Sequence, residues 1–277
     1  MDNVFSFSRI GTYKNCPFSY YLIYIKNNDR KNGVYGLLGG KLHSIMEELE
    51  HNKITNEQAL ELWNSEIDYM EFLNELNFPT EKSKNNYIED IRLYLKHFKP
   101  IDFKGKDVFV EEHFEIKIKD KYLLQGYIDL YSVDKEKKEI EIIDYKTSSK
   151  SGFTKNKLVE KCYQLILYSI ALENKYPGYK ISKTSFDMVK YAINNNTKKV
   201  KERIDISKDE LSEYSRYFID VEYNTENKEK LLKYISDSID KIESLNTEDS
   251  TLWTPVKNKF FCENLCSVSE CCEYFKE

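Results

Sequence analysis

Two aspartates and a lysine stand on neighbouring apolar segments in the middle of the chain. Asp129 ends a Gly-Tyr-Ile-Asp run, and Asp144 and Lys146 end an isoleucine-rich one. Side chains alternate between the faces of a strand, so Asp144 and Lys146 point the same way. A charged turn joins residues 122–133 to 139–146, which predicts an antiparallel hairpin that brings Asp129 near Asp144. Two carboxylates beside one lysine would suit metal-assisted phosphodiester hydrolysis, although ordinary ion pairs on a wet sheet face would have the same pattern.

Two further segments could contribute to the same site. Upstream, a Gly-Gly pair opens an amphipathic segment with His43 at the edge of its apolar stripe, which consists of Leu42, Ile45, Met46 and Leu49. Downstream, Gln164 and Tyr168 are four residues apart in an expected helix over 157–174 and share a face. Each has an ordinary structural explanation, because lone histidines and polar residues at helix edges are often packing residues. His51, His97 and His113 have no comparable context.

In combination these residues resemble the PD-(D/E)XK nucleases of the RecB type, including the CRISPR-adaptation exonuclease and related phage proteins. The resemblance implies a restriction-endonuclease-like core whose metal ligands fall on His43, Asp129, Asp144 and the backbone carbonyl of Tyr145. The catalytic lysine of that family falls on Lys146. Its Q-x-x-x-Y motif falls on Gln164 and Tyr168, which would position the substrate and the lysine. The motif's proline is absent here, since Ile128 precedes Asp129.

The residue types of this site indicate its cation. Carboxylate and carbonyl oxygens suit Mg²⁺ or Mn²⁺, and a histidine favours Mn²⁺. The metal would polarise the phosphate and acidify a bound water, while Lys146 would orient or deprotonate that water. Glu111 or Glu112, in an expected strand over 108–118, could add an acidic contact, and the sequence does not decide which of the two faces the site.

The cysteines form a second group. Cys262, Cys266 and Cys272 have the spacing of metal ligands near the C-terminal end of the sequence, with Cys271 adjacent and Cys16 far upstream. In the RecB-type relatives an N-terminal cysteine joins three C-terminal ones around a [4Fe-4S] cluster, so the resemblance assigns Cys16, Cys262, Cys266 and Cys272 to such a cluster. We prefer Cys272 to Cys271 because of the five-residue gap. A four-cysteine Zn²⁺ site and unligated thiols remain alternatives.

Composition and charge limit the class of protein. The chain has 277 residues, 32% of them charged, and a formal net charge of −5, which argues against a protein that coats DNA by neutralising phosphates over its whole surface. A local track could still run beside the site along Lys146, Lys150, Lys155, Lys157 and Lys161. The chain has no apolar run of membrane-spanning length and no signal-peptide pattern at Met1, so we expect no membrane partner and a cytoplasmic location in a bacterial or phage-infected cell.

The resemblance also implies a substrate and partners. We expect DNA, single-stranded or at ends, to be degraded as by an exonuclease, with a helicase, recombinase or integrase as a candidate partner. The alternative is a non-catalytic or partner-dependent DNA-end-binding subunit of a recombination, phage or CRISPR-adaptation complex.

The periodicity predicts one mixed α/β domain over 1–277, in which helices flank a central mixed sheet. We expect a helix over 8–25, a helical subdomain over 37–100, and a staple that joins Cys16 to residues 252–277. Strands are expected over 108–118, 122–133, 139–146, 184–193 and 198–204, and further helices over 157–174, 208–217 and 225–245.

Overall fold

The computed structural model of the protein describes residues 4–118, 121–153, 160–203, 213–245, 247 and 249–275. The chain divides into two compact units. The terminal unit comprises Met1–Leu38, His113–Gly126 and Glu229–Glu277, and the central unit comprises Gly39–Glu112 and Tyr127–Lys228. The strands of the described residues belong to one mixed sheet in the order β1-β3-β4-β5-β6, with β2 beside β3 and β7 beside β5. The expected α/β class is therefore confirmed.

The central unit contains the expected hairpin. Strand β3 (Tyr122–Asp134) pairs antiparallel with β4 (Glu139–Lys146), with Leu130 opposite Ile143. The turn closes because the Asp134 carboxylate accepts the backbone N–H groups of Glu136 and Lys137. This turn chemistry is local in the chain, so the sequence sufficed to predict the hairpin.

A parallel pair follows the hairpin. Strand β4 lies parallel to β5 (Lys180–Asn194), with Asp144 opposite Phe186. Parallel strands need a long crossover connection, and here it contains α7 (Tyr163–Lys175), which packs against both strands. Strand β5 also pairs antiparallel with β6 (Val200–Glu202) and with β7 (Tyr214–Asp220). The buried face of α7 thus covers the strand that carries Asp144.

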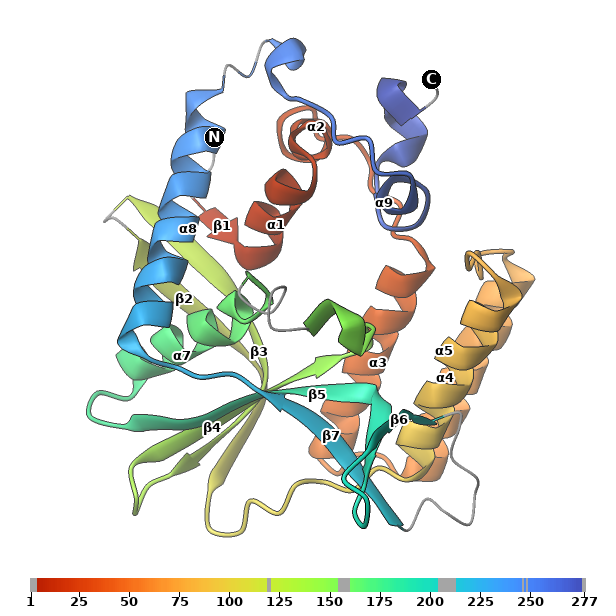
Figure 1. The fold of residues 1–277 in the computed structure, drawn as a ribbon, viewed down its shortest axis with the longest axis vertical. Helices are drawn as coiled ribbons and strands as arrows, with labels where there is room; N and C mark the ends of the chain where they lie inside the picture. The colour runs from red at the N-terminus through yellow and green to blue at the C-terminus, as the bar shows by residue number, and fades with distance from the viewer. Residues whose placement is uncertain are drawn as a thin grey trace. The chain divides into compact units, whose positions relative to one another are not determined.

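Three helices occupy the interval that was expected to be helical: α3 (Val34–Glu50), α4 (Asn56–Phe72) and α5 (Glu81–Lys96). Helices α4 and α5 each begin with a capping box, at Thr55 and Thr80, which explains where the chain breaks between them. Figure 1 shows α4 and α5 side by side, and α5 packs in turn against β5.

In the terminal unit, β1 (Val4–Ser6) pairs in parallel with the beginning of β3. The single helix expected over 8–25 is instead three pieces: α1 (Phe7–Asn15), α2 (Pro17–Tyr20) and a π-helical turn at Tyr21–Ile25. The break has a physical reason, because Pro17 disfavours helical backbone at the residue before it and leaves Cys16 extended. Cys16 is therefore presented at a helix junction.

The other helical segments of this part of the chain are α8 (Thr225–Ser244) and α9 (Lys259–Asn264), with short 3-10 turns at Ser250–Leu252, Ser269–Cys271 and Glu273–Phe275. Strand β2 (Asp107–Ile118) and a 3-10 turn at Lys150–Phe153 complete the described elements.

One expected element is wrong in its described part. The helix expected over 208–217 includes Tyr214, which begins strand β7, while residues 204–212 lie outside the described part of the chain. Aromatic and β-branched residues dominate Tyr214–Asp220 and favour a strand, and pairing with β5 satisfies its backbone groups. The helix expected from 157 is described from residue 160 onward, and its regular part begins at Tyr163. None of the described helices is long and apolar enough to cross a membrane.

Candidate functional site

An imidazole and two carboxylates converge at one point of the central unit. His43 of α3, Glu111 of β2 and Asp129 of β3 each offer one ligand atom, and these atoms lie within 4.8 Å of one another. The Nδ1 of His43 is 3.4 Å from Asp129 Oδ2 and 3.8 Å from Glu111 Oε1. An imidazole nitrogen and two carboxylate oxygens in this arrangement could hold a divalent cation.

The backbone decides which of the two adjacent glutamates joins this cluster. Glu111 has φ +49, in the left-handed region that a glutamate rarely adopts, and its carboxylate faces His43. Glu112 points elsewhere, since its carboxylate pairs with Lys175 and accepts a hydrogen bond from Tyr131. Glu111 is thus the acidic contact that the sequence left undecided, and no local sequence signal could have identified it.

Asp129 is held by the strand beside it. Its side chain is almost completely buried, and its Oδ2 accepts a 2.9 Å hydrogen bond from the backbone N–H of Tyr145. In the β3–β4 ladder Leu130 lies opposite Ile143, so the Asp129 carboxylate takes a backbone donor just beyond that pair. This places the peptide of Tyr145 beside the cluster.

Asp144 lies outside the three-residue cluster but acts on it electrostatically. Its side chain is fully buried and pairs with the Lys146 ammonium, while its Oδ1 has no hydrogen-bond partner among the described residues. A buried carboxylate oxygen without a partner costs free energy unless a cation or water satisfies it. The buried, unpartnered oxygen of Asp144 is therefore suited to binding a metal ion.

The pKa values of these groups shift in the directions that their neighbours dictate. Burial raises the pKa of Asp144, the Asp129 charge adds to this, and together they bring it to about 7 against the pull of Lys146 and His43. Burial alone would raise the pKa of Asp129 too. His43, Lys146 and the Tyr145 N–H together outweigh burial and bring the pKa below its ordinary value. Burial disfavours the His43 cation, yet its contacts with Asp129 and Glu111 outweigh burial and raise its pKa to about 10.

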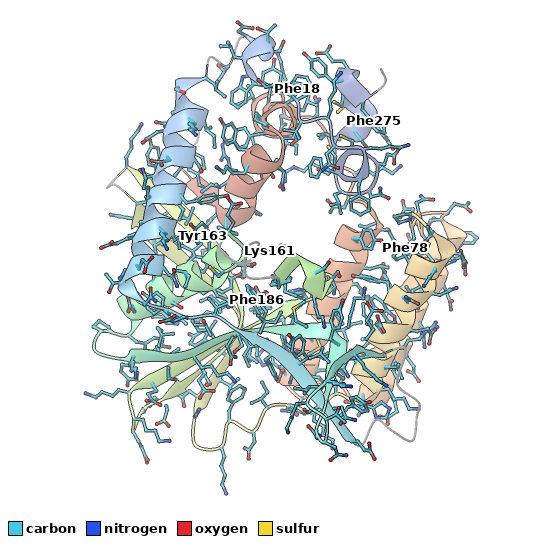
Figure 2. All side chains as sticks on the ribbon, viewed as in Figure 1. Phe18, Phe78, Lys161, Tyr163, Phe186 and Phe275 are labelled. Atoms are coloured by element: carbon cyan, nitrogen blue, oxygen red, sulfur yellow. The ribbon has the colours of Figure 1, made fainter. Side chains whose placement is uncertain are left out.

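The two motif residues on α7 connect to the lysine. The Lys146 ammonium donates a 2.9 Å hydrogen bond to the Gln164 side-chain oxygen, and the Gln164 amide donates a 2.6 Å bond to the Tyr168 hydroxyl. Phe186, labelled in Figure 2, lies on β5 with its ring centroid 5.5 Å from the same ammonium. Lys146 is thereby held between Asp144 and Gln164, so all of the expected residues of this site meet in one unit.

The expected lysine track is described only in part. Lys155 and Lys157 lie outside the described residues. The Lys150 ammonium lies 5.9 Å from the Tyr191 ring centroid, and the Lys161 ammonium lies 4.8 Å from that of Phe153. Both lysines therefore rest on aromatic rings of the central unit.

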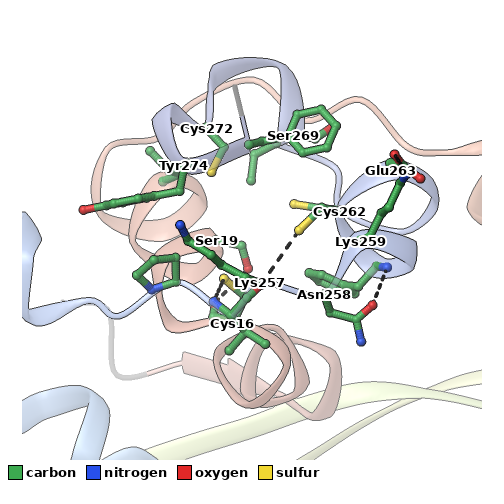
Figure 3. Close-up of a pocket in the computed structure, with 17 residues that line it drawn as sticks. Cys16, Ser19, Lys257, Asn258, Lys259, Cys262, Glu263, Ser269, Cys272 and Tyr274 are labelled. Atoms are coloured by element: carbon green, nitrogen blue, oxygen red, sulfur yellow. Dashed lines mark hydrogen bonds and ion pairs between the residues drawn. The ribbon is translucent and has the colours of Figure 1, made fainter. Parts of the chain in front are cut away.

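The terminal unit brings four cysteines around one cavity of about 550 Å³ (Figure 3). Its lining includes Cys16, Cys262, Cys266 and Cys272. Burial raises the pKa of Cys266 to about 11, and the three other thiols add to this shift, so the four are electrostatic neighbours. Cys271 is not part of the lining: it is exposed, and its Sγ contacts Asn28 and the Val268 carbonyl.

The spacing of these thiols bears on the metal that they could hold. Tetrahedral zinc with Zn–S bonds of about 2.3 Å brings its thiolates within about 3.8 Å of each other. A polynuclear cluster separates its thiolates more widely, because each binds a different iron. Four thiols around one cavity are a ligand set that either a single zinc ion or an iron–sulfur cluster could use.

Comparison with known proteins supplies the family. Residues 4–273 match the PD-(D/E)XK nuclease superfamily. A comparison with curated proteins gave no match. Among solved structures, the chain is similar to the one described as "Crystal structure of SSO0001", with 15% identity, a TM-score of 0.36, and coverage of 99% of this chain and 87% of that one. Because the family match spans nearly the whole sequence, this chain belongs to the PD-(D/E)XK nuclease superfamily.

Proposed function

We propose that this protein is a Mg²⁺- or Mn²⁺-dependent deoxyribonuclease of the RecB type that degrades DNA from single-stranded or exposed ends. The observation that carries the proposal is the meeting of His43, Glu111 and Asp129 beside the Asp144–Lys146 pair. Superfamily membership supports phosphodiester hydrolysis. The exonuclease mode and the preference for ends rest on the RecB-type resemblance alone.

In this proposal His43, Glu111, Asp129, Asp144 and the Tyr145 carbonyl hold the cation. When bound, the cation supplies Lewis-acid polarisation of the phosphate and a more acidic water. Lys146 orients that water and offsets the charge that develops on the phosphate oxygens. Gln164 fixes the Lys146 ammonium through its 2.9 Å hydrogen bond, and Tyr168 fixes Gln164 in turn. Near-complete burial of Asp129 and Asp144 keeps bulk water away from the carboxylates.

We further propose that Cys16, Cys262, Cys266 and Cys272 hold a [4Fe-4S] cluster with a structural role. The four thiols around one cavity and the RecB-type resemblance support this proposal. A cluster here would cross-link Cys16 to the last part of the chain. On a chain-entropy estimate, closing a loop of this length contributes at most about 5 kcal/mol.

The test is cleavage of end-labelled single- and double-stranded DNA with Mn²⁺, Mg²⁺ or a chelator. We expect metal-dependent cutting that Lys146→Ala reduces by about 100-fold or more in turnover, with a smaller change in DNA affinity. Lys183→Ala is the control, because Lys183 is half-exposed and pairs only loosely with Asp220. Well-folded wild type that binds DNA ends without cutting them would support the alternative of a partner-dependent subunit that works with a helicase, recombinase or integrase.

A further inference from the structure

The side chain of Tyr145 joins strand β4 to helix α3. Its ring lies edge-on to the His43 ring, with centroids 6.3 Å apart and an interplanar angle of 87°. Its hydroxyl donates a hydrogen bond to the Glu50 carboxylate. The Tyr145 side chain is buried, and its two partners are half-buried. One tyrosine thus contacts the helix that carries His43 at two points.

The spacing along α3 explains how one side chain can reach both residues. Glu50 follows His43 by seven residues, about two helical turns, so the two residues lie on the same face. At the other end of this face, Gly39 approaches the residue that follows β4, where an added Cβ would lie 3.9 Å from Thr147 Oγ1. Helix α3 therefore contacts Tyr145 of β4 at two positions and lies close to the chain just beyond that strand at a third.

The backbone of the same tyrosine contacts the cluster. Its N–H donates to Asp129 Oδ2, and its carbonyl is a proposed metal ligand. Along a strand the Tyr145 side chain points away from those of Asp144 and Lys146. The residue therefore touches the site through its peptide and α3 through its side chain, so a shift of the ring would also shift the peptide.

A buried polar network lies beside the ring. The Arg216 guanidinium lies 5.8 Å from the Tyr145 ring centroid. It donates to Asp187 Oδ2 at 2.9 and 2.6 Å, and the Tyr94 hydroxyl donates to the same oxygen at 2.7 Å. The guanidinium beside the ring is therefore itself held by buried hydrogen bonds.

We propose that Glu50 and the Tyr145 side chain are positioning residues that hold His43 and the Tyr145 peptide at the spacing needed for metal binding. Neither side chain is a ligand in this arrangement, and both act through α3 and β4. The inference rests on the metal site of the proposed function. Groups behind metal ligands commonly change metal affinity by 10- to 100-fold when removed.

The first experiment compares Tyr145→Phe with Tyr223→Phe in the full-length protein. Both variants lose one hydroxyl that donates to a half-buried carboxylate of the central unit, Glu50 in one case and Glu173 in the other. We expect Tyr145→Phe to raise the dissociation constant for Mn²⁺, measured by calorimetry, by about 10-fold. Tyr223→Phe should change it by less than about twofold, because its hydroxyl donates to Glu173 on α7, which is not part of the cluster. Equal weakening in both variants would overturn the proposal in favour of general loosening.

Glu50 gives a second, independent comparison. Glu50→Gln keeps an oxygen that can accept the Tyr145 hydroxyl and should retain Mn²⁺ affinity near that of wild type, whereas Glu50→Ala should match Tyr145→Phe. The Glu50→Ala, Tyr145→Phe double variant should be no worse than either single one, since both remove the same hydrogen bond. Full additivity of the two changes would contradict the proposed positioning role of Glu50 and Tyr145.

A third readout separates this inference from the proposed function. Hydrogen exchange of the residue 145 amide in metal-free protein reports the bond to Asp129 directly. We expect faster exchange at this amide in Tyr145→Phe than in Tyr223→Phe, whether or not the protein cuts DNA. Wild type that binds Mn²⁺ without cleaving DNA would defeat the nuclease proposal and leave the positioning role of Glu50 and Tyr145 unaffected. Unchanged exchange at residue 145 in Tyr145→Phe would defeat that positioning role.

Discussion

The backbone N–H of Tyr145 lies 2.9 Å from Oδ2 of Asp129, a hydrogen bond between residues sixteen positions apart. The bond connects the Asp129 carboxylate on β3 to the peptide N–H that follows the buried Asp144 on β4. The strands bring the two acids together, and this bond orients one of them. The candidate metal site is built on strands and a helix rather than on loops, which suits a precisely positioned ligand set.

Replacement of Asp144 should change how stability depends on pH. Its pKa rises from 3.8 to about 7 on folding, so the folded state binds more protons between these values. The stabilising contribution of Asp144 is fully present below about pH 4 and is lost as the pH rises through about 7. Urea unfolding of metal-free protein at about pH 5 and about pH 8 should show a loss of stability in wild type that is smaller in Asp144→Asn. Parallel behaviour of the two proteins would contradict the buried, proton-binding carboxylate.

Metal binding should release a proton from His43. The pKa of His43 is about 10 in metal-free protein, whereas a metal ligand must be a neutral imidazole. At about pH 8, where Asp144 with its pKa of about 7 is mostly ionised, binding of Mn²⁺ should therefore expel about one proton from His43, and binding should weaken as the pH falls. Calorimetry in buffers with different ionisation enthalpies measures this release. His43→Asn should remove most of it, and a binding enthalpy independent of buffer in wild type would show that His43 is not a ligand.

Glu111→Gly should weaken metal binding and stabilise the metal-free protein. Glu111 holds φ +49, which costs a side-chain-bearing residue about 1 kcal/mol relative to glycine. Glu111→Gly should raise the free energy of unfolding of metal-free protein by about that amount, and it should weaken Mn²⁺ binding. Lys138→Gly is a matched control, because Lys138 has φ +54 in the exposed β3–β4 turn, whereas Asp129 lies toward the other end of that hairpin. The Lys138→Gly variant should gain similar stability and keep its Mn²⁺ affinity. Weaker Mn²⁺ binding in this variant would mean that the backbone change alone explains the loss of affinity in Glu111→Gly.

The cysteine cavity predicts a difference between adjacent thiols. Cys16→Ser and Cys272→Ser should each abolish the visible absorbance of a cluster in protein prepared without oxygen and lower its melting temperature. Cys271→Ser should leave both properties as in wild type, since that thiol is exposed and lies outside the cavity lining. Colourless wild-type protein containing stoichiometric zinc would refute the cluster and favour the four-cysteine Zn²⁺ site.

Local patterns in the sequence predicted much of the central unit. The alternation of apolar and polar residues and a charged turn were enough to predict the β3–β4 hairpin and its two aspartates. The helix over residues 225–244 was also predicted closely, because its amphipathic repeat is regular. These features depend on neighbours a few positions apart, which is why the sequence contains them.

Tertiary structure decided the features that depend on distant neighbours. The turn of the backbone at Glu111 selects it over Glu112, and pairing with β5 makes a strand of Tyr214–Asp220, where a helix was expected at its beginning. Nothing in the sequence singled out Glu50, whose role appears only when α3 lies against Tyr145. The sequence by itself determined which residue types are present and their local periodicity. Which of them meet was decided by packing and strand pairing over tens to hundreds of residues, because such contacts leave no short-range pattern.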